Sequence, residues 1–242
     1  MRTNFALSFY IATLVLIPLL FIQALWVRFQ TLKLPEPIGK RSGTCGEGDE
    51  ISLLIIGDSA AAGVGVNDQT NALAGQLSKK LSAKHKVNWT LIANTGLTSI
   101  GLIEKFSALT MQKFDYILVS IGVNDVTHLT TKDHWLNNIK SLIKLLNADF
   151  NSSKVIFSNI PPMHLFSNIP QPLRWWLGAR AKSFNKQLAT AIEHNEQCTF
   201  LTFDIPFNQK HLAADKFHPS EHAYSLWAEI AAESIILSTQ AK

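Results

Sequence analysis

Cysteine and clustered charge are both scarce in this chain of 242 residues. Its two cysteines, Cys45 and Cys198, lie far apart in sequence and lack the Cys-x-x-Cys spacing of a zinc or redox site. A single disulfide and two free thiols therefore both remain open. The net charge is only +4, and no Lys/Arg block reaches the length of a nucleic-acid-binding tail. We expect no nucleic-acid partner.

The N-terminal segment Phe5–Val27 has no charged residue at all. As a helix it would be roughly 34 Å long, enough to cross a bilayer. A cleaved signal peptide usually has a shorter apolar region that ends at a small-x-small site, and no such site follows here. We therefore predict a membrane anchor over residues 1–28, with Trp26 and Arg28 at the interface. The flanking charges do not indicate on which side of the membrane the rest of the chain lies.

Beyond the anchor, the composition changes twice. Residues 29–50 mix proline and glycine with scattered charges, which predicts a linker. From residue 51 to 242, short apolar runs alternate with longer amphipathic stretches, the pattern of repeated strand–helix units. Strands are expected at 51–56, 87–92, 115–121, 154–159 and 200–204, and helices at 70–84, 98–110, 132–147, 174–196 and 219–237. Five such strands predict an α/β domain with a five-stranded parallel sheet covered by helices on both faces.

Unusual polar clusters follow the predicted strands. In open parallel sheets, ligands bind beyond the carboxyl ends of the strands, so these clusters should lie together on one rim. In chain order they are Gly57-Asp58-Ser59, Asn94-Thr95-Gly96, Gly122-Val123-Asn124-Asp125, Pro161-Pro162-Met163 and Asp215-Lys216-Phe217-His218-Pro219.

The first and last clusters contain the groups of a serine hydrolase. A serine hydroxyl is a weak nucleophile until a base removes its proton, and the base works best when a third group orients it. We expect Ser59 to be the nucleophile, His218 the base and Asp215 the group that orients it. Attack on an ester creates an oxyanion that needs hydrogen-bond donors, and the backbone N–H groups of Ser59 and Gly96 and the side-chain amide of Asn124 could supply them.

Four of the five clusters resemble the sequence blocks of the SGNH hydrolases, also called GDSL-type esterases and lipases. They are Gly57-Asp58-Ser59, the cluster with Gly96, Gly122-Val123-Asn124-Asp125 and Asp215-Lys216-Phe217-His218-Pro219. The resemblance extends from about residue 51 to 236 and implies a three-layer α/β/α sandwich of flavodoxin-like strand order. It also implies hydrolysis of carboxylic esters or thioesters through an acyl-enzyme intermediate, without a metal or other cofactor. Two positions depart from the family pattern: Ala60 replaces a common leucine, and Phe217 replaces a common glycine. Phe217 is expected to narrow or reshape the acyl site.

Several alternative interpretations remain at this stage. The protein could be a carbohydrate O-acetyl esterase, or a membrane-tethered binding domain that has lost turnover. Asp215, His218 and His222 could instead hold a metal, although the glutamate of a His-Glu-x-x-His metallohydrolase is absent. Asp58 and Asp125 are expected to shape their loops through hydrogen bonds rather than to react.

The segment Ile160–Gly178 combines four prolines with bulky apolar side chains. It could be a wall or lid of the acyl pocket, or a packed connection whose tryptophans cover the core or touch a membrane. Its Arg174 and the nearby Arg180 could meet a charged substrate or could be solvated helix charges. The apolar segment and the anchor are consistent with a small-molecule or lipid ester as substrate. The physiological ester and the oligomeric state are not indicated by the sequence.

Overall fold

The computed structural model describes residues 2–107, 113–149, 154–203, 208 and 210–240. The strands are β1 (Ser42–Cys45), β2 (Glu50–Gly57), β3 (Lys86–Ala93), β4 (Tyr116–Ser120), β5 (Lys154–Ser158) and β6 (Cys198–Leu201). The α-helices are α1 (Arg2–Gln30), α2 (Ser59–Ala62), α3 (Leu73–Leu81), α4 (Ser99–Ser107), α5 (Val123–Thr127), α6 (Lys132–Asp149), α7 (Leu173–Ile192) and α8 (Glu221–Gln240). Two short 3-10 helices are η1 (Gln69–Asn71) and η2 (Met163–Leu165). The last residues of the helix expected at 98–110 and of the strand expected at 200–204 lie outside the described residues.

The strands form one sheet in the order β1-β3-β2-β4-β5-β6. All neighbouring pairs are parallel except β1 with β3, which is antiparallel. Renumbered among themselves, the five parallel strands follow the order 2-1-3-4-5, which is the flavodoxin-like arrangement. This confirms the predicted parallel sheet and its strand order.

The prediction of five strands was wrong, because the sheet has a sixth strand at its edge. β1 comes from the segment expected to be a linker, and Gly43 in it faces Trp89 of β3. Its four residues are alternately exposed and half-buried, so they lack the apolar run by which the other strands were found.

The two cysteines lie in the strands at opposite edges of the sheet. Cys45 belongs to β1 and Cys198 to β6, and both are free thiols. Five strand spacings of about 4.8 Å separate these edges, far beyond the reach of a disulfide. The two-thiol alternative therefore holds.

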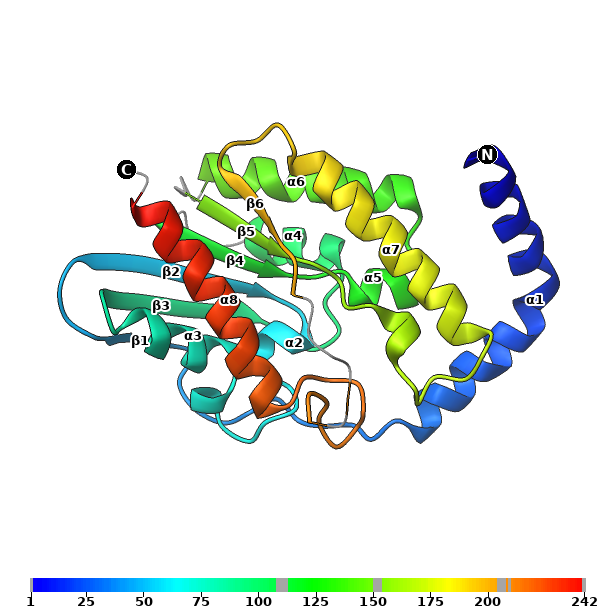
Figure 1. Cartoon of the computed structure of the whole chain (residues 1–242), viewed down its shortest axis with the longest axis horizontal. Helices are drawn as coiled ribbons and strands as arrows, with labels where there is room; N and C mark the ends of the chain where they lie inside the picture. Colours follow the sequence, from blue (N-terminus) through cyan, green and yellow to red (C-terminus); the bar gives the residue numbers. More distant parts are fainter. Residues whose placement is uncertain (1, 108–112, 150–153, 204–207, 209, 241–242) are drawn as a thin grey trace.

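Helices cover both faces of the sheet, as Figure 1 shows. Successive residues of β2 point to opposite faces: Leu54 and Ile56 pack with the side chains of α4, α6 and α7, while Leu53 and Ile55 pack with those of α3 and α8. These four side chains of β2 are fully buried. The result is the three-layer α/β/α sandwich predicted from the sequence.

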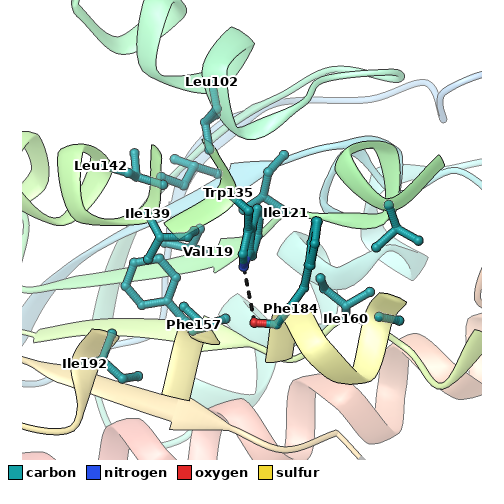
Figure 2. Packing of buried hydrophobic residues seen from close by; sticks show 14 of the residues in the cluster. Leu102, Val119, Ile121, Trp135, Ile139, Leu142, Phe157, Ile160, Phe184 and Ile192 are labelled. Atoms are coloured by element: carbon teal, nitrogen blue, oxygen red, sulfur yellow. Dashed lines mark hydrogen bonds between the residues drawn. The ribbon is translucent and has the colours of Figure 1, made fainter. Parts of the chain in front are cut away.

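Trp135 joins two of the covering helices. Its ring, fully buried on α6, stacks on Phe184 of α7 with the ring centroids 5.0 Å apart. The indole Nε1–H also donates to the backbone oxygen of Phe184 at 3.1 Å, the dashed line in Figure 2. This contact fixes the position of α7 relative to α6.

The N-terminal helix α1 stands at the side of the sandwich, near the beginning of α7 (Figure 1). Residues Ile11–Gln30 have a mean hydropathy of 2.0 and are long and apolar enough to cross a membrane, as either an anchor or a signal sequence would be. One face of α1 contacts the domain: Leu20 is buried, and Gln23 donates to the backbone oxygen of Gln171 at 2.6 Å and accepts from the N–H of Leu173 at 3.0 Å. Most of its other apolar side chains are exposed.

Candidate functional site

Ser59 lies where β2 turns sharply into the short helix α2. Gly57, the last residue of β2, runs so close to β4 that a Cβ atom there would lie 1.8 Å from the backbone oxygen of Ser120. Asp58 then caps α2 by accepting from the N–H of Ala60 at 3.1 Å. Gly63 ends the helix at a φ of +94°, a conformation that glycine adopts readily. The run of small residues therefore builds a tight turn with the serine at its tip.

The three residues expected to react lie within hydrogen-bonding distance of one another. The hydroxyl oxygen of Ser59 is 2.8 Å from Nε2 of His218, and Nδ1 of His218 is 2.5 Å from Oδ2 of Asp215. Ser59 follows β2, the first of the parallel strands, whereas Asp215 and His218 precede the last helix, α8. His218 lies 159 residues after Ser59 in the sequence. The fold thus brings together groups from both ends of the domain.

The second oxygen of Asp215 holds the backbone of its own turn. Oδ1 accepts from the N–H groups of Phe217 and His218, each at 3.0 Å. Burial opposes ionisation of this carboxyl, but the hydrogen bonds from the His218 ring and from these two N–H groups outweigh burial and lower the pKa of Asp215. The carboxylate is therefore charged at neutral pH and can orient the imidazole.

The two other predicted donors, Gly96 and Asn124, follow β3 and β4, the strands on either side of β2. Residues 94–97 form a turn closed by a hydrogen bond from the Leu97 N–H to the Asn94 oxygen at 3.3 Å, and Gly96 in it has a φ of +85°. No atom lies within 4 Å of where a Gly96 Cβ would be, so the space beside it is open. The Asn124 amide donates one N–H to the Leu97 oxygen at 2.8 Å, which ties it to the turn.

Asp58 and Asp125 make the loop contacts expected of them. The Asp125 carboxylate accepts from the Ser99 N–H at 2.8 Å and from the Ser99 hydroxyl at 2.6 Å, at the beginning of α4. Burial is the main reason why the pKa of both aspartates is raised, to about 7 for Asp58.

A small apolar cavity of about 70 Å³ opens beside Ser59 and His218. Phe217 forms part of its wall and stacks on Phe166, with ring centroids 5.2 Å apart. Other walls come from the end of β4, the loop after β5 and the beginning of α8, through Ile121, Ile160, Pro161 and Trp227. The cavity therefore opens directly beside the Ser59 hydroxyl and the His218 ring.

The segment Ile160–Gly178 is in part a wall of the cavity and in part a packed connection. Its first part, through Phe166, forms a wall of the cavity. Its second part packs against the N-terminal helix, where the Trp176 indole donates to the Thr13 hydroxyl at 3.1 Å. Arg180 is neither a solvated charge nor directed at a substrate, because its guanidinium donates to the backbone oxygens of Val126 and Thr130 at 3.1 and 2.7 Å.

The metal alternative finds no support in this geometry. The His222 ring stacks on His211 at 5.1 Å, while both ring nitrogens of His218 face Ser59 and Asp215. Among the described residues, no three His, Cys, Asp or Glu side chains are grouped so as to hold a metal ion.

One group at the edge of this site, Glu36, has no counterpart among the residues expected from the sequence. Glu36, in the segment expected to be a linker, accepts from the backbone N–H of Thr95 at 2.7 Å, next to Gly96. The two residues are 59 positions apart, and a single acidic residue between two prolines carries no sequence signal for such a contact.

A flavodoxin-like sandwich with a serine, a histidine and an aspartate close together at the carboxyl rim of its sheet is the arrangement expected of an SGNH hydrolase. Residues 55–226 match the GDSL-like lipase/acylhydrolase family. The chain belongs to this family.

Known proteins agree with this membership. The GDSL-like esterase Rv1075c of Mycobacterium tuberculosis is 23% identical over 198 residues, which cover 75% of this chain and 60% of that protein. The chain thus spans less than two thirds of this relative's length.

Two solved structures share the fold. The psychrotrophic esterase EstA from Pseudoalteromonas sp. superimposes with a TM-score of 0.63 at 22% identity, over 78% of this chain and 98% of its own. The acetylxylan esterase Axe2 from Geobacillus stearothermophilus gives 0.60 at 18% identity, over 78% and 95% of the two chains.

Proposed function

We propose that the protein hydrolyses carboxylic esters with Ser59 as nucleophile, His218 as general base and acid, and Asp215 as the group that orients the histidine. The observation that carries this proposal is the chain of contacts from the Ser59 hydroxyl through both nitrogens of His218 to the Asp215 carboxylate. Because Asp215 accepts from Nδ1–H, Nε2 is left as an acceptor for the serine proton.

The reaction follows from these positions. The Ser59 oxygen bonds to the ester carbonyl carbon while its proton passes to Nε2 of His218, and the carbonyl electron pair moves onto oxygen. When this tetrahedral intermediate collapses, the carbon–oxygen bond to the alcohol breaks and the alcohol takes the proton from Nε2. An acyl ester of Ser59 remains, and a water molecule activated by His218 then releases the acid in the same two steps.

The oxyanion is assigned to three donors. These are the backbone N–H groups of Ser59 and Gly96 and the second side-chain N–H of Asn124, whose first N–H holds the turn. Their support is their place at adjacent strand ends and the open space beside Gly96. Removal of one such donor typically slows turnover about 10²–10³-fold.

We assign the acyl group to a short chain. A cavity of about 70 Å³ is roughly half the volume of one that holds benzene and equals the liquid volume of two or three water molecules. It therefore accommodates an acetyl group. A carbohydrate O-acetyl ester is the second candidate, because an acetyl group fits the same cavity and a relative in fold is an acetylxylan esterase.

The assignment is tested by the wild type and the Ser59→Ala variant with p-nitrophenyl acetate, together with labelling by a fluorophosphonate. We expect hydrolysis and covalent labelling in the wild type and the loss of both in the variant, with unchanged thermal unfolding. Full turnover by Ser59→Ala would refute the nucleophile. An unlabelled, inactive wild type would instead favour a binding domain without turnover. Acetylated xylan in parallel separates the two candidate substrates.

A further inference from the structure

The segment between α1 and β1 reaches the turn that carries Gly96. One carboxylate oxygen of Glu36 accepts from both the backbone N–H and the hydroxyl of Thr95, at 2.7 and 2.9 Å. The other accepts from Arg41 at 2.8 Å, and the same guanidinium donates to the backbone oxygen of Ala93, at the end of β3. Glu36 and Arg41 together therefore connect the turn to the strand from which it emerges.

This contact bears on the direction of the Gly96 N–H. The turn's own hydrogen bond, from the Leu97 N–H to the Asn94 oxygen, leaves the Thr95 N–H to an outside partner. The Gly96 N–H belongs to the rigid peptide unit that begins at the Thr95 Cα, whereas the Thr95 N–H belongs to the unit before it, so the Gly96 N–H turns with rotation about the Thr95 Cα–C bond. Glu36 accepts from both the N–H and the hydroxyl of Thr95, which fixes the Cα and Cβ of that residue and so restrains the position from which the next N–H projects.

The same segment also contacts the nucleophile's side of the site. Pro37 is buried so close to Gly63, at the end of α2, that its Cγ lies 2.9 Å from where a Gly63 Cβ would be. Ile38 exchanges backbone hydrogen bonds with the loop that follows, donating to Asn67 at 3.1 Å and accepting from Gln69 at 2.8 Å. The segment thus contacts both the turn with Gly96 and the end of α2, and these contacts hold the backbone of Glu36 in place.

We propose that Glu36, held by Arg41, is a positioning residue that aims the Gly96 N–H at the oxyanion. The inference rests on the proposed function, since it supposes an oxyanion at Ser59. It assigns a role in the reaction to a segment outside the blocks that define the family.

The charge state of Glu36 agrees with this role. Burial opposes its ionisation, but the hydrogen bonds from Thr95 and Arg41 outweigh burial and lower the pKa of the carboxyl. The carboxylate is therefore charged at neutral pH and accepts from Thr95 as an anion, which gives a stronger hydrogen bond than a neutral acceptor.

The test compares Glu36→Ala with Glu50→Ala in the full chain, with p-nitrophenyl acetate as substrate and phenylboronic acid as an analogue of the tetrahedral intermediate. Glu50 is a matched control, because its carboxylate accepts from Lys86 at 3.0 Å and from Asn88 at 2.5 Å, at the amino end of β2 and away from the site. Glu36→Gln serves as the conservative variant, since its amide oxygen can still accept from Thr95.

We expect Glu36→Ala to lower kcat about tenfold, part of the 10²–10³-fold loss that follows removal of a whole donor, with KM within about twofold of the wild type. The boronic acid should bind about tenfold more weakly. Glu36→Gln should recover most of both losses, and Glu50→Ala should match the wild type. Thermal unfolding of each variant reports its folded fraction.

The inference is overturned if Glu36→Ala keeps wild-type kcat and boronic acid affinity, or if it loses only what its unfolded fraction explains. These outcomes differ from failure of the proposed function, in which the wild type itself would be inactive or Ser59→Ala would remain active.

Discussion

At the residue scale, Asp58 places a carboxyl in a buried position next to Ser59. Burial raises its pKa to about 7, although the hydrogen bond from the Ala60 N–H and the proximity of His218 both oppose this increase. The folded protein therefore keeps the Asp58 proton at pH values where the unfolded chain, with a pKa near 3.8, has lost it. Because folding then favours proton binding, the contribution of this residue to stability decreases from about pH 4 to pH 7 and is constant above.

Asp58→Asn should remove this dependence, because asparagine keeps an acceptor oxygen for the Ala60 N–H and does not titrate. We expect the variant to gain stability over the wild type as pH rises from 4 to 7, by on the order of a few kcal/mol. Urea unfolding at several pH values measures the difference in free energy of unfolding between the variant and the wild type. Asp68→Asn is the control: Asp68 caps η1 through the same contact, to the Thr70 N–H at 2.9 Å, but its pKa is lowered. An equal pH response in both variants would contradict the prediction.

The titration of Asp215 has the opposite sign and falls in a lower pH window. Its lowered pKa stabilises the folded state above the ordinary carboxyl value of 3.8, and this stabilisation is lost as pH falls through the folded-state pKa. The difference between Asp58→Asn and the wild type is therefore measured above pH 4, where Asp215 is charged in both.

Phe217 is the residue at which acyl length should be decided. It stacks on Phe166 across the cavity and presents its edge to His218 at 5.3 Å. Phe217→Ala removes part of the cavity wall but keeps the backbone N–H that donates to Asp215. The ratio of kcat/KM for the hexanoyl p-nitrophenyl ester to that for the acetyl ester should therefore rise about tenfold or more. Leu165→Ala, an exposed change in the same loop, should leave this ratio unchanged. An unaltered ratio in Phe217→Ala would mean that acyl chains bind elsewhere.

At the element scale, substitution of Trp135 tests how much its contact with Phe184, between α6 and α7, contributes to stability. Trp135→Phe removes the hydrogen bond to the Phe184 oxygen and leaves part of the indole volume empty, which should lower the free energy of unfolding by about 1–3 kcal/mol. Trp175→Phe, at a side chain that is 39% exposed, should change it by less than about 0.5 kcal/mol. Urea unfolding measures the free energy of unfolding of both variants. Equal losses would contradict the proposal that Trp135 stabilises the packing of α6 against α7.

The elements that sequence patterns predicted are those whose burial leaves a strong signal. β2 and β4 are buried on both faces and read as continuous apolar runs, so their positions were predicted within a residue or two. β1 was missed because an edge strand with small, half-exposed residues has no such run. The helix expected at 70–84 is shorter, α3 at Leu73–Leu81 after the separate turn η1, since Asp68 caps that turn with its own hydrogen bonds.

The site was predictable to the extent that its residues stand directly after strands. Ser59, Gly96 and Asn124 follow β2, β3 and β4, so the rule for parallel sheets places them together without any knowledge of contacts. Glu36 follows no strand of the parallel sheet, and its contact with Thr95 depends on the path of a proline-rich segment. Only coordinates reveal a contact of that kind.

At the scale of the whole molecule, we propose that α1 anchors the protein in a membrane. The full chain should sediment with membranes and remain there after a wash at high salt or alkaline pH, because a mostly apolar helix of 20 residues partitions into lipid through its hydrophobic surface rather than through charge. The mass of the mature protein distinguishes an anchor from a removed signal. A mature chain that begins after Val27, or one released by the wash, would contradict the anchor.

The contact between Glu36 and Thr95 also predicts which proteolytic fragments keep the proposed activity. A protease that acts before Leu34 would separate α1 from the sandwich and leave the carboxylate in place. Cleavage just before Ile51 would remove Glu36, Arg41 and the edge strand β1 together. We therefore expect the first soluble fragment to remain a full catalyst and the second to keep its nucleophile but to hydrolyse esters slowly.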